Sequence, residues 1–163
     1  ISSWSFAQNS ISDGMTRYLT ANGTINYYSE VVDRMFDFLK TEYKDQEVPE
    51  AIWVDLSDVK TTAIKDITEM LIQSYEGHFT PEELNEMIAF YDSEVGMKIL
   101  MKSEIGPEEV KLRDAFYASE LGQKIVSSSE SLNTILQKIT QEWSAQLFRN
   151  VQQKLSEKGF TKG

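Results

Sequence analysis

The sequence contains no cysteine and a single histidine, and these two shortages exclude several kinds of site. Without cysteine there is no disulfide, thiolate zinc site, iron–sulfur cluster or cysteine nucleophile. One histidine also excludes sites that need two imidazoles, such as the paired Glu-x-x-His motifs of di-iron bundles. The motifs G-x-x-x-x-G-K-[ST], G-x-G-x-x-G and G-x-S-x-G are absent as well. We therefore expect no metal, no cofactor and no catalytic residue of these types.

Positive charge is scarce too. Sixteen lysines and arginines stand against 26 acidic residues, which gives a net charge of −10. This balance disfavours nucleic acids and anionic lipids as partners, because their phosphates require basic patches. No apolar run approaches the roughly 18–20 residues that cross a bilayer. A chain of 163 residues with this composition suits one acidic domain without a transmembrane segment.

The N-terminal segment has two interpretations. Ser5 and Ala7 form the small-x-small pattern found where a secretory signal is cleaved. Residues 1–9 are therefore either the remnant of an export signal, with the mature protein beginning near Gln8, or a disordered terminus. Residues 10–163 are expected to form a single domain. The first interpretation places the protein in the periplasm or outside the cell, and the absence of cysteine is compatible with export.

Only three prolines occur, and each precedes a glutamate, at Pro49, Pro81 and Pro107. Proline at the first helical position loses only an N–H that would lack a partner anyway, and the following acid meets the positive end of the helix dipole. Residues 80–83 (Thr-Pro-Glu-Glu) form a capping box, and residues 127–130 (Ser-Ser-Ser-Glu) suggest a second. The prolines therefore predict three helix starts.

Apolar residues recur at three- and four-residue steps, as on one face of an α-helix. The spacing predicts a short helix over residues 12–21 and a second helix over residues 24–43. A short and a longer helix with a break near Ser57-Asp58 come next, and a long amphipathic helix ends at Gly159. No segment alternates apolar and polar residues in the manner of a strand. The predicted fold is all-α, a compact bundle of six or seven helices. The apolar face of the C-terminal helix consists of Leu132, Ile135, Leu136, Ile139, Trp143, Leu147, Phe148, Val151 and Leu155.

Residues 81–99 and 107–125 are two copies of one unit. They read PEELNEMIAFYDSEVGMKI and PEEVKLRDAFYASELGQKI and agree at 11 of 19 positions, which indicates a duplicated helical unit. The apolar pair Met87-Ile88 of the first copy becomes Arg113-Asp114 in the second. The second copy must therefore present a wetter face, because burying two uncompensated charges is costly.

The positions shared by the two copies have structural explanations, which we prefer to a ligand-binding role. Phe90-Tyr91 and Phe116-Tyr117 are expected to be aromatic anchors in the core. Ser93 and Ser119 would cap the chain after a bend, and Gly96 and Gly122 would allow the close approach of another helix. Glu94–Lys98 and Glu120–Lys124 have the i,i+4 spacing of helical ion pairs.

The pattern Phe-Tyr-x-Ser-x-x-Gly-x-Lys occurs at residues 90–98, after Tyr75 and the segment 78–84, and again at residues 116–124 before the helix with Trp143. These motifs resemble the signature of the bacterial family known as domain of unknown function 2059. The resemblance covers roughly residues 64–158 and suggests a member whose signature unit is duplicated. It implies an exported helical protein of the cell envelope. The family has no established activity, so the resemblance assigns no catalytic residue.

Two positions depart from the family pattern, because Glu94 and Glu120 stand where the family usually has proline. This departure suggests a smoother passage from one helix to the next. The residues to which the resemblance assigns a structural role in the motif are Phe79, Thr80, Glu83, Leu84, Phe90, Tyr91, Ser93, Gly96, Lys98, Phe116, Tyr117, Ser119, Gly122, Lys124 and Trp143.

His78 and three acidic groups are the remaining candidates for chemistry. His78 lies in a connector, where it could be a general base or a metal ligand. We prefer the interpretation that it is a loop residue near a helix C-terminus. The acids could pair for glycoside chemistry or bind Ca²⁺, although none has the spacing of a calcium loop. The groups are Asp55 and Asp58; Glu82, Glu83 and Glu86; and Glu104, Glu108 and Glu109.

Charge is uneven along the chain, since residues 138–163 carry +3 and the rest carries −13. Such a basic helix can lie on a membrane or dock on a partner, and our default expectation is that it docks on the acidic body of the same molecule. We expect an exported, non-enzymatic module that binds an unknown protein or small ligand in the bacterial envelope. Two alternatives stay open: a hydrolase-like enzyme that uses carboxylates at a helix–helix cleft, and a structural protein that self-associates.

Overall fold

The structure is a computed structural model that describes residues 2–162, with side chains described for residues 9–162. Within residues 2–162 there is no strand, so the all-α class is confirmed, and seven of the helices contain seven or more residues. The elements are α1 (Ser2–Ala21), α2 (Thr24–Glu42), the 3₁₀ turn η1 (Lys44–Gln46), α3 (Glu50–Asp55), α4 (Ser57–Glu76), α5 (Pro81–Asp92), α6 (Glu94–Leu100), α7 (Pro107–Ala118) and α8 (Glu120–Glu157).

The first helix begins at Ser2, ten residues before the predicted start at residue 12. Ile1 lies outside the described residues, as do the side chains of residues 2–8. The proposal that residues 1–9 are an export-signal remnant or a disordered terminus therefore stays a prediction.

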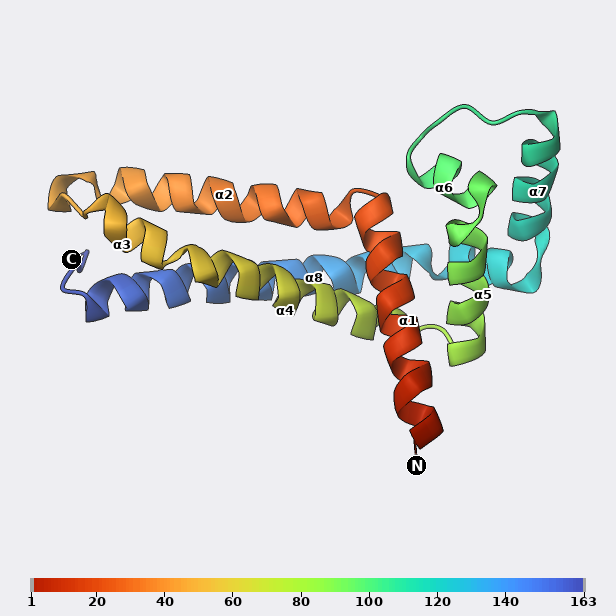
Figure 1. Ribbon diagram of the computed structural model, residues 1–163, viewed down its shortest axis with the longest axis horizontal. Helices are drawn as coiled ribbons and strands as arrows, with labels where there is room; N and C mark the ends of the chain where they lie inside the picture. Colours follow the sequence, from red (N-terminus) through yellow and green to blue (C-terminus); the bar gives the residue numbers. More distant parts are fainter. Residues whose placement is uncertain (1, 163) are drawn as a thin grey trace.

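The long helices α2, α4 and α8 run side by side, α1 crosses them near one end, and α5, α6 and α7 lie at that same end (Figure 1). Helix α4 packs against both α8 and α2, and α1 packs mainly against α5. The C-terminus lies at the opposite end beside α3, where the Gln46 side-chain amide donates a hydrogen bond to the Thr161 carbonyl at 2.7 Å (Figure 1). The molecule is thus elongated along α8.

The accessible surface reflects this elongation. It measures 10337 Å², whereas a compact monomer of this mass exposes about 8,300 Å². The 38 residues of α8 extend over about 57 Å at 1.5 Å per residue, which is longer than a compact domain of this size. The fold therefore leaves more helix surface in contact with solvent than a compact bundle would.

Most of the predicted helix boundaries are confirmed. The Thr80 hydroxyl accepts a hydrogen bond from the Glu83 N–H at 3.2 Å, and the Glu83 carboxylate accepts one from the Thr80 N–H at 2.8 Å. Leu56 separates α3 from α4 at the predicted break. At the end of α8, Gly159 adopts a φ of 93°, and the Phe160 N–H returns to the Leu155 carbonyl at 2.9 Å.

The second predicted capping box, at residues 127–130, is wrong, because α8 runs through this segment without interruption. The Ser129 hydroxyl donates to the Val126 carbonyl at 2.7 Å, and the Ser127 hydroxyl donates to the Lys124 carbonyl at 3.2 Å. A serine inside a helix can satisfy its hydroxyl on the preceding turn in this way. Residues 123–158 contain no proline or glycine that would stop the helix.

The predicted docking of the C-terminal helix on the rest of the molecule is observed. Trp143, Leu147, Val151 and Leu155 are all buried, and α8 packs mainly against α4. The ring of Tyr28 in α2 also lies 5.4 Å from that of Trp143. The Trp143 indole N–H donates to the Ala63 carbonyl at 2.9 Å, so its one polar atom is also satisfied. The predicted apolar face of this helix is thus in or against the core, with the exception of Ile135, which is exposed.

Candidate functional site

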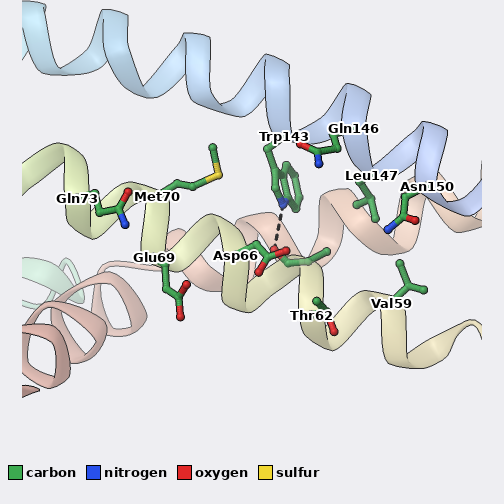
Figure 2. A pocket seen from close by; sticks show the side chains of 11 residues that line it. Val59, Thr62, Asp66, Glu69, Met70, Gln73, Trp143, Gln146, Leu147 and Asn150 are labelled. Carbon is green, nitrogen blue, oxygen red and sulfur yellow. Dashed lines mark hydrogen bonds between the residues drawn. The ribbon is translucent and has the colours of Figure 1, made fainter.

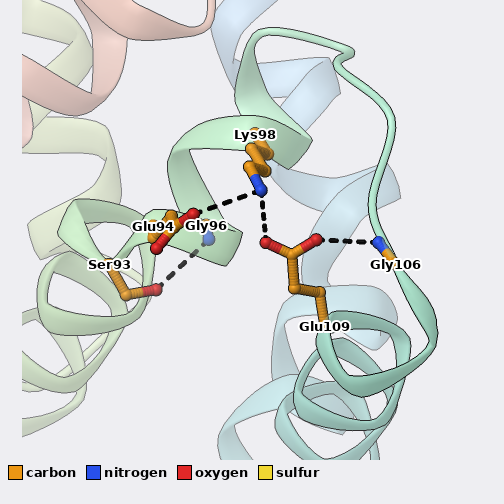
Figure 3. A network of polar contacts seen from close by, with 6 residues as sticks. All are labelled: Ser93, Glu94, Gly96, Lys98, Gly106 and Glu109. Carbon is orange, nitrogen blue, oxygen red and sulfur yellow. Dashed lines mark hydrogen bonds and ion pairs between the residues drawn. The ribbon is translucent and has the colours of Figure 1, made fainter.

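Both copies of the repeat make the same turn at their serine. The Ser93 hydroxyl accepts a hydrogen bond from the Gly96 N–H at 3.2 Å (Figure 3). The same hydroxyl donates a hydrogen bond to the Phe90 carbonyl. In the second copy, the Ser119 hydroxyl accepts from the Gly122 N–H at 3.1 Å and donates to the Phe116 carbonyl at 2.5 Å. Each serine therefore ends one helix and caps the next, as predicted.

The glycine that comes three residues after each serine lies directly against the preceding helix. A Cβ atom on Gly96 would lie 2.0 Å from the Phe90 carbonyl oxygen, and one on Gly122 would lie 2.1 Å from that of Phe116. Both contacts are with backbone, which cannot rotate away as a side chain can. The motif therefore requires glycine so that two consecutive helices can meet at a sharp angle. The smoother passage expected from Glu94 and Glu120 is wrong, because Ser93 and Ser119 have extended backbone that interrupts the helix.

The aromatic residues of one copy contact their own counterparts in the other. The rings of Phe90 and Phe116 stack with centroids 3.8 Å apart and an angle of 2° between their planes. The hydroxyls of Tyr91 and Tyr117 share a hydrogen bond of 3.0 Å. Residues that meet their own equivalents lie on or near a twofold axis. The two copies thus pack as an internal dimer.

Two ion pairs across the copy interface confirm this symmetry. Lys98 contacts Glu109 at 2.5 Å (Figure 3). Lys124, the equivalent of Lys98, contacts Glu83, the equivalent of Glu109, at 2.6 Å. Such reciprocity is the mark of an isologous interface. The carboxylate of Glu109 also accepts a hydrogen bond from the Gly106 N–H at 2.7 Å, so the same side chain both caps α7 and joins the two copies.

One predicted pair is wrong. Lys98 does contact Glu94 at 3.2 Å as the i,i+4 spacing suggests, but Lys124 pairs with Glu83 instead of Glu120. The reason is that Glu83 lies closer to the core, where its carboxylate already accepts the helix N–H of the capping box, whereas an exposed i,i+4 pair is weak.

These contacts favour the charged form of the two capping acids. The hydrogen bond from Lys124, followed by the backbone hydrogen bond at Thr80, lowers the pKa of Glu83. In the same way, Lys98 and then the Gly106 N–H lower the pKa of Glu109. Because hydrogen bonds to a carboxylate favour its charged form, both groups are ionised at neutral pH and cannot act as proton donors there.

A cluster of tyrosines extends from the copy interface toward α1. The Tyr18 ring lies 5.0 Å from that of Tyr91 and 5.9 Å from that of Tyr75, measured between centroids. Burial, followed by the neighbouring tyrosines, raises the pKa of Tyr75 and of Tyr91. The phenols of Tyr75 and Tyr91 therefore stay neutral. The hydroxyls of Tyr91 and Tyr117 converge on each other rather than on a charged pocket.

The two copies differ in what covers them. In α5, Leu84, Met87 and Ile88 are buried against α1 and its neighbours, whereas α7 has no buried residue. Arg113 and Asp114, which replace Met87 and Ile88, pair with each other at 2.8 Å and stay in contact with solvent. The prediction that the second copy has a more solvent-exposed face is confirmed.

The remaining signature residues also have packing roles in the structure. Phe79 is buried, and the Lys124 ammonium lies 5.4 Å from the centre of its ring. His78 lies in the connector after α4, where its Nδ1 is 3.0 Å from the Ser74 carbonyl oxygen and its Nε2 is 3.5 Å from the Ser131 hydroxyl. His78 is thus held at a helix C-terminus, as its position in the sequence suggested.

Of the predicted acidic groups, Asp55 and Asp58 line one pocket together, with Glu157, Lys154 and Lys158 beside them. Asp55 lies 3.8 Å from Lys158, and Glu108 lies 2.7 Å from Lys111. No three His, Asp or Glu side chains among residues 9–162 gather in a way that could hold a metal ion. None of the described helices is both long and apolar enough to cross a membrane.

A groove between α4 and α8 is the feature that sequence reasoning missed (Figure 2). Its volume is ≈ 310 Å³, and we call it the α4–α8 groove. Helical periodicity on each helix was the available signal, but it does not specify which two helices become neighbours. Its lining consists of Val59, Thr62, Ala63, Asp66, Glu69, Met70 and Gln73 of α4 with Trp143, Gln146, Leu147 and Asn150 of α8.

Comparison with known protein families agrees with the division into two copies. The sequence model of the family described as "Uncharacterized protein conserved in bacteria (DUF2059)" matches residues 65–105 and, as an adjacent segment, residues 106–150. No curated protein and no solved structure matches the chain significantly. Because the match covers more than half of the sequence and its internal boundary falls between the copies, the chain belongs to this family of uncharacterised bacterial proteins, with the signature unit duplicated.

Proposed function

We propose that this protein is a non-enzymatic interaction module of the bacterial cell envelope. The observation that carries the proposal is that the signature side chains that could take part in catalysis instead join the two copies. The hydroxyls of Tyr91 and Tyr117 form a hydrogen bond with each other. Lys98 forms an ion pair with Glu109, and Lys124 forms one with Glu83. A motif committed to internal packing supports a scaffold for binding rather than a reactive centre.

The envelope part of the proposal is supported by the small-x-small pattern at Ser5 and Ala7 and by the resemblance of the motifs to exported proteins. The enzyme alternative has less support, because two of the acids it could use, Glu83 and Glu109, are held ionised in ion pairs. Exposed apolar side chains such as Leu112 and Val126, at 58% and 62%, are compatible with partner binding or self-association.

Two measurements in the native bacterium test this proposal. Mass spectrometry of the protein isolated from separated periplasm and cytoplasm would locate it and identify its mature N-terminus. A photo-crosslinking amino acid is then placed at Gln73 on the α4–α8 groove and, as a control, at the exposed Glu104. We expect periplasmic protein and a discrete cross-linked partner from Gln73 alone. Confinement to the cytoplasm would overturn the envelope assignment, and identical products from both positions would overturn the binding assignment.

A further inference from the structure

We propose that the α4–α8 groove binds a basic, amphipathic segment of a partner protein. This inference rests on the proposed interaction function and deepens it, because it names the site and the chemistry of the partner. Three features of the groove support it, namely its shape, its apolar floor and the charge of its rims.

The shape of the groove fits a length of polypeptide. Its α4 lining runs from Val59 to Gln73, which corresponds to about 21 Å at 1.5 Å per residue. The α8 lining spans Trp143 to Asn150 at three- and four-residue steps alongside it (Figure 2). A shallow feature of this length between two helices matches the groove in which an amphipathic helix lays its apolar face.

The floor of the groove is apolar and adaptable. Trp143 donates its indole N–H to the Ala63 carbonyl, so the groove meets the hydrocarbon surface of the ring and not its polar atom. Leu147 and the half-buried Met70 continue this floor. Methionine can adjust to side chains of different shape, which suits a surface that accepts one apolar stripe of a partner.

The rims of the groove have acidic charge only. Asp66 and Glu69 contribute carboxylates, and the lining contains no lysine or arginine. Glu69 has a lysine neighbour, Lys65, but their charged atoms are 4.0 Å apart and both side chains are largely exposed, so this pair is weak. The body of the protein has a large excess of acids over bases. Charge complementarity therefore selects a basic segment, whose lysines or arginines would face the carboxylates.

Amide side chains complete the rims. Gln73 on α4 and Gln146 and Asn150 on α8 are uncharged and reach solvent, and each offers both hydrogen-bond donors and an acceptor. These groups can bond to polar side chains of a bound segment without adding a charge. The combination of an apolar floor, acidic rims and amides excludes phosphate-rich ligands, since the groove has no cation to receive them.

The test uses the full chain and two synthetic peptides of about 14 residues, a length that spans the groove as a helix. Both have leucine at positions i, i+3, i+4 and i+7; one has lysine at the remaining positions and the other glutamate. Binding is followed by fluorescence anisotropy at low salt and at about 0.5 M salt. We expect the lysine peptide to bind, salt to weaken its binding about tenfold, and the glutamate peptide not to bind.

Matched variants locate the site. Asp66→Asn with Glu69→Gln removes two charges at the groove, and Glu86→Gln with Glu104→Gln removes two exposed charges elsewhere. We expect the first pair to weaken binding of the lysine peptide about tenfold and the second about twofold or less, with melting temperatures unchanged. Equal losses in both pairs would show general attraction to an acidic protein and overturn the proposal.

The remaining outcomes are also decisive. Binding of both peptides alike, or of neither, would overturn the basic-segment assignment, whereas the cross-linking from Gln73 in the bacterium would still test the interaction function by itself. If sedimentation showed a dimer of the protein that Asp66→Asn with Glu69→Gln dissolved, the groove would belong to a second copy of the chain and the proposal would fail.

Discussion

Gly96 and Gly122 occupy positions that no larger residue can enter without moving the backbone. We expect Gly96→Ala to destabilise the protein by at least about 2 kcal/mol, because the added methyl would overlap a carbonyl that belongs to the preceding helix. Chemical denaturation followed by circular dichroism measures this loss. Gly77→Ala is the matched control, since its Cβ would have 3.5 Å of room and Gly77 already has a helical φ of −73°. An unchanged stability of Gly96→Ala would contradict the observed close packing.

Because of Glu83 and Glu109, the stability of the fold depends on pH in the acidic range. Their pKa values are lower in the folded protein than the ordinary value of 4.5, so they contribute stability above that pH and lose it as the pH falls through their lowered pKa values. We expect the melting temperature to decline as the pH falls below 4.5. In the double variant Glu83→Gln with Glu109→Gln, the melting temperature should decline less steeply with falling pH. This variant should also be less stable than the original protein at neutral pH.

The control for this experiment is the pair Glu86→Gln with Glu104→Gln, which removes two exposed acids outside the copy interface. Its melting temperature should follow that of the original protein between pH 7 and about pH 3. If the control flattened the acid decline as much as Glu83→Gln with Glu109→Gln, net charge rather than the two ion pairs would be responsible.

Helix α8 illustrates how local signals can be overridden at the scale of an element. The serines at residues 127–129 resemble a helix start, yet the helix that begins at Glu120 continues through them. The first copy begins in the same way, but α6 ends after seven residues, where Lys102 adopts a positive φ of 56° before the Gly106-Pro107 pair. The helices after the two serine caps thus begin alike and differ in length.

Ser128→Pro distinguishes a continuous helix from a capped start. If Ser127 were an N-cap, Ser128 would be the first helical position, where proline is tolerated. In the middle of α8, proline removes a hydrogen bond and clashes with the preceding turn, so we expect a loss of about 3 kcal/mol in the free energy of unfolding. Ser128→Ala should leave the stability unchanged or raise it slightly. Equal stabilities of the two variants would favour the capped start.

Helices α5 and α7 show the opposite case, in which sequence differences correctly predicted a structural difference. Both begin with Pro-Glu-Glu and end at a serine cap, but only α5 is covered by α1. The apolar pair Met87-Ile88 can be buried, whereas Arg113-Asp114 cannot be buried without a large desolvation cost. Two side chains are therefore enough to make one copy internal and the other peripheral.

At the scale of the whole molecule, the fold depends on the last 26 residues. A chain that ends at residue 137 loses Trp143, Leu147, Val151 and Leu155, each of which contributes about 2 kcal/mol when buried. Their sum is comparable to the entire stability of a typical domain. We expect this truncated chain to show no cooperative thermal unfolding by circular dichroism.

A chain that ends at residue 160 is the control, because it retains these four side chains and loses only contacts such as that between Gln46 and Thr161. It should unfold cooperatively at nearly the original temperature. If the chain ending at residue 137 also unfolded cooperatively, the C-terminal helix would be an appendage free to lie on a membrane or partner, and not part of the core.

Much of this protein's structure is determined by its sequence alone. The all-α class, the duplication, the serine caps, the C-terminal stop at Gly159 and the wetter second copy are all encoded in local patterns, namely apolar periodicity, proline and glycine positions, and single substitutions between copies. These features depend on interactions between residues a few positions apart, whose geometry in a helix is known in advance.

The pairing of the copies and the groove were decided only by the tertiary structure. Nothing in the spacing of Lys124 indicates that its partner is Glu83, 41 positions away, rather than Glu120 in the same helix turn. The α4–α8 groove likewise depends on α4 lying beside α8. Contacts of this kind require the chain to fold back on itself, and the free energy that selects one arrangement comes from packing the whole core, which no short segment encodes.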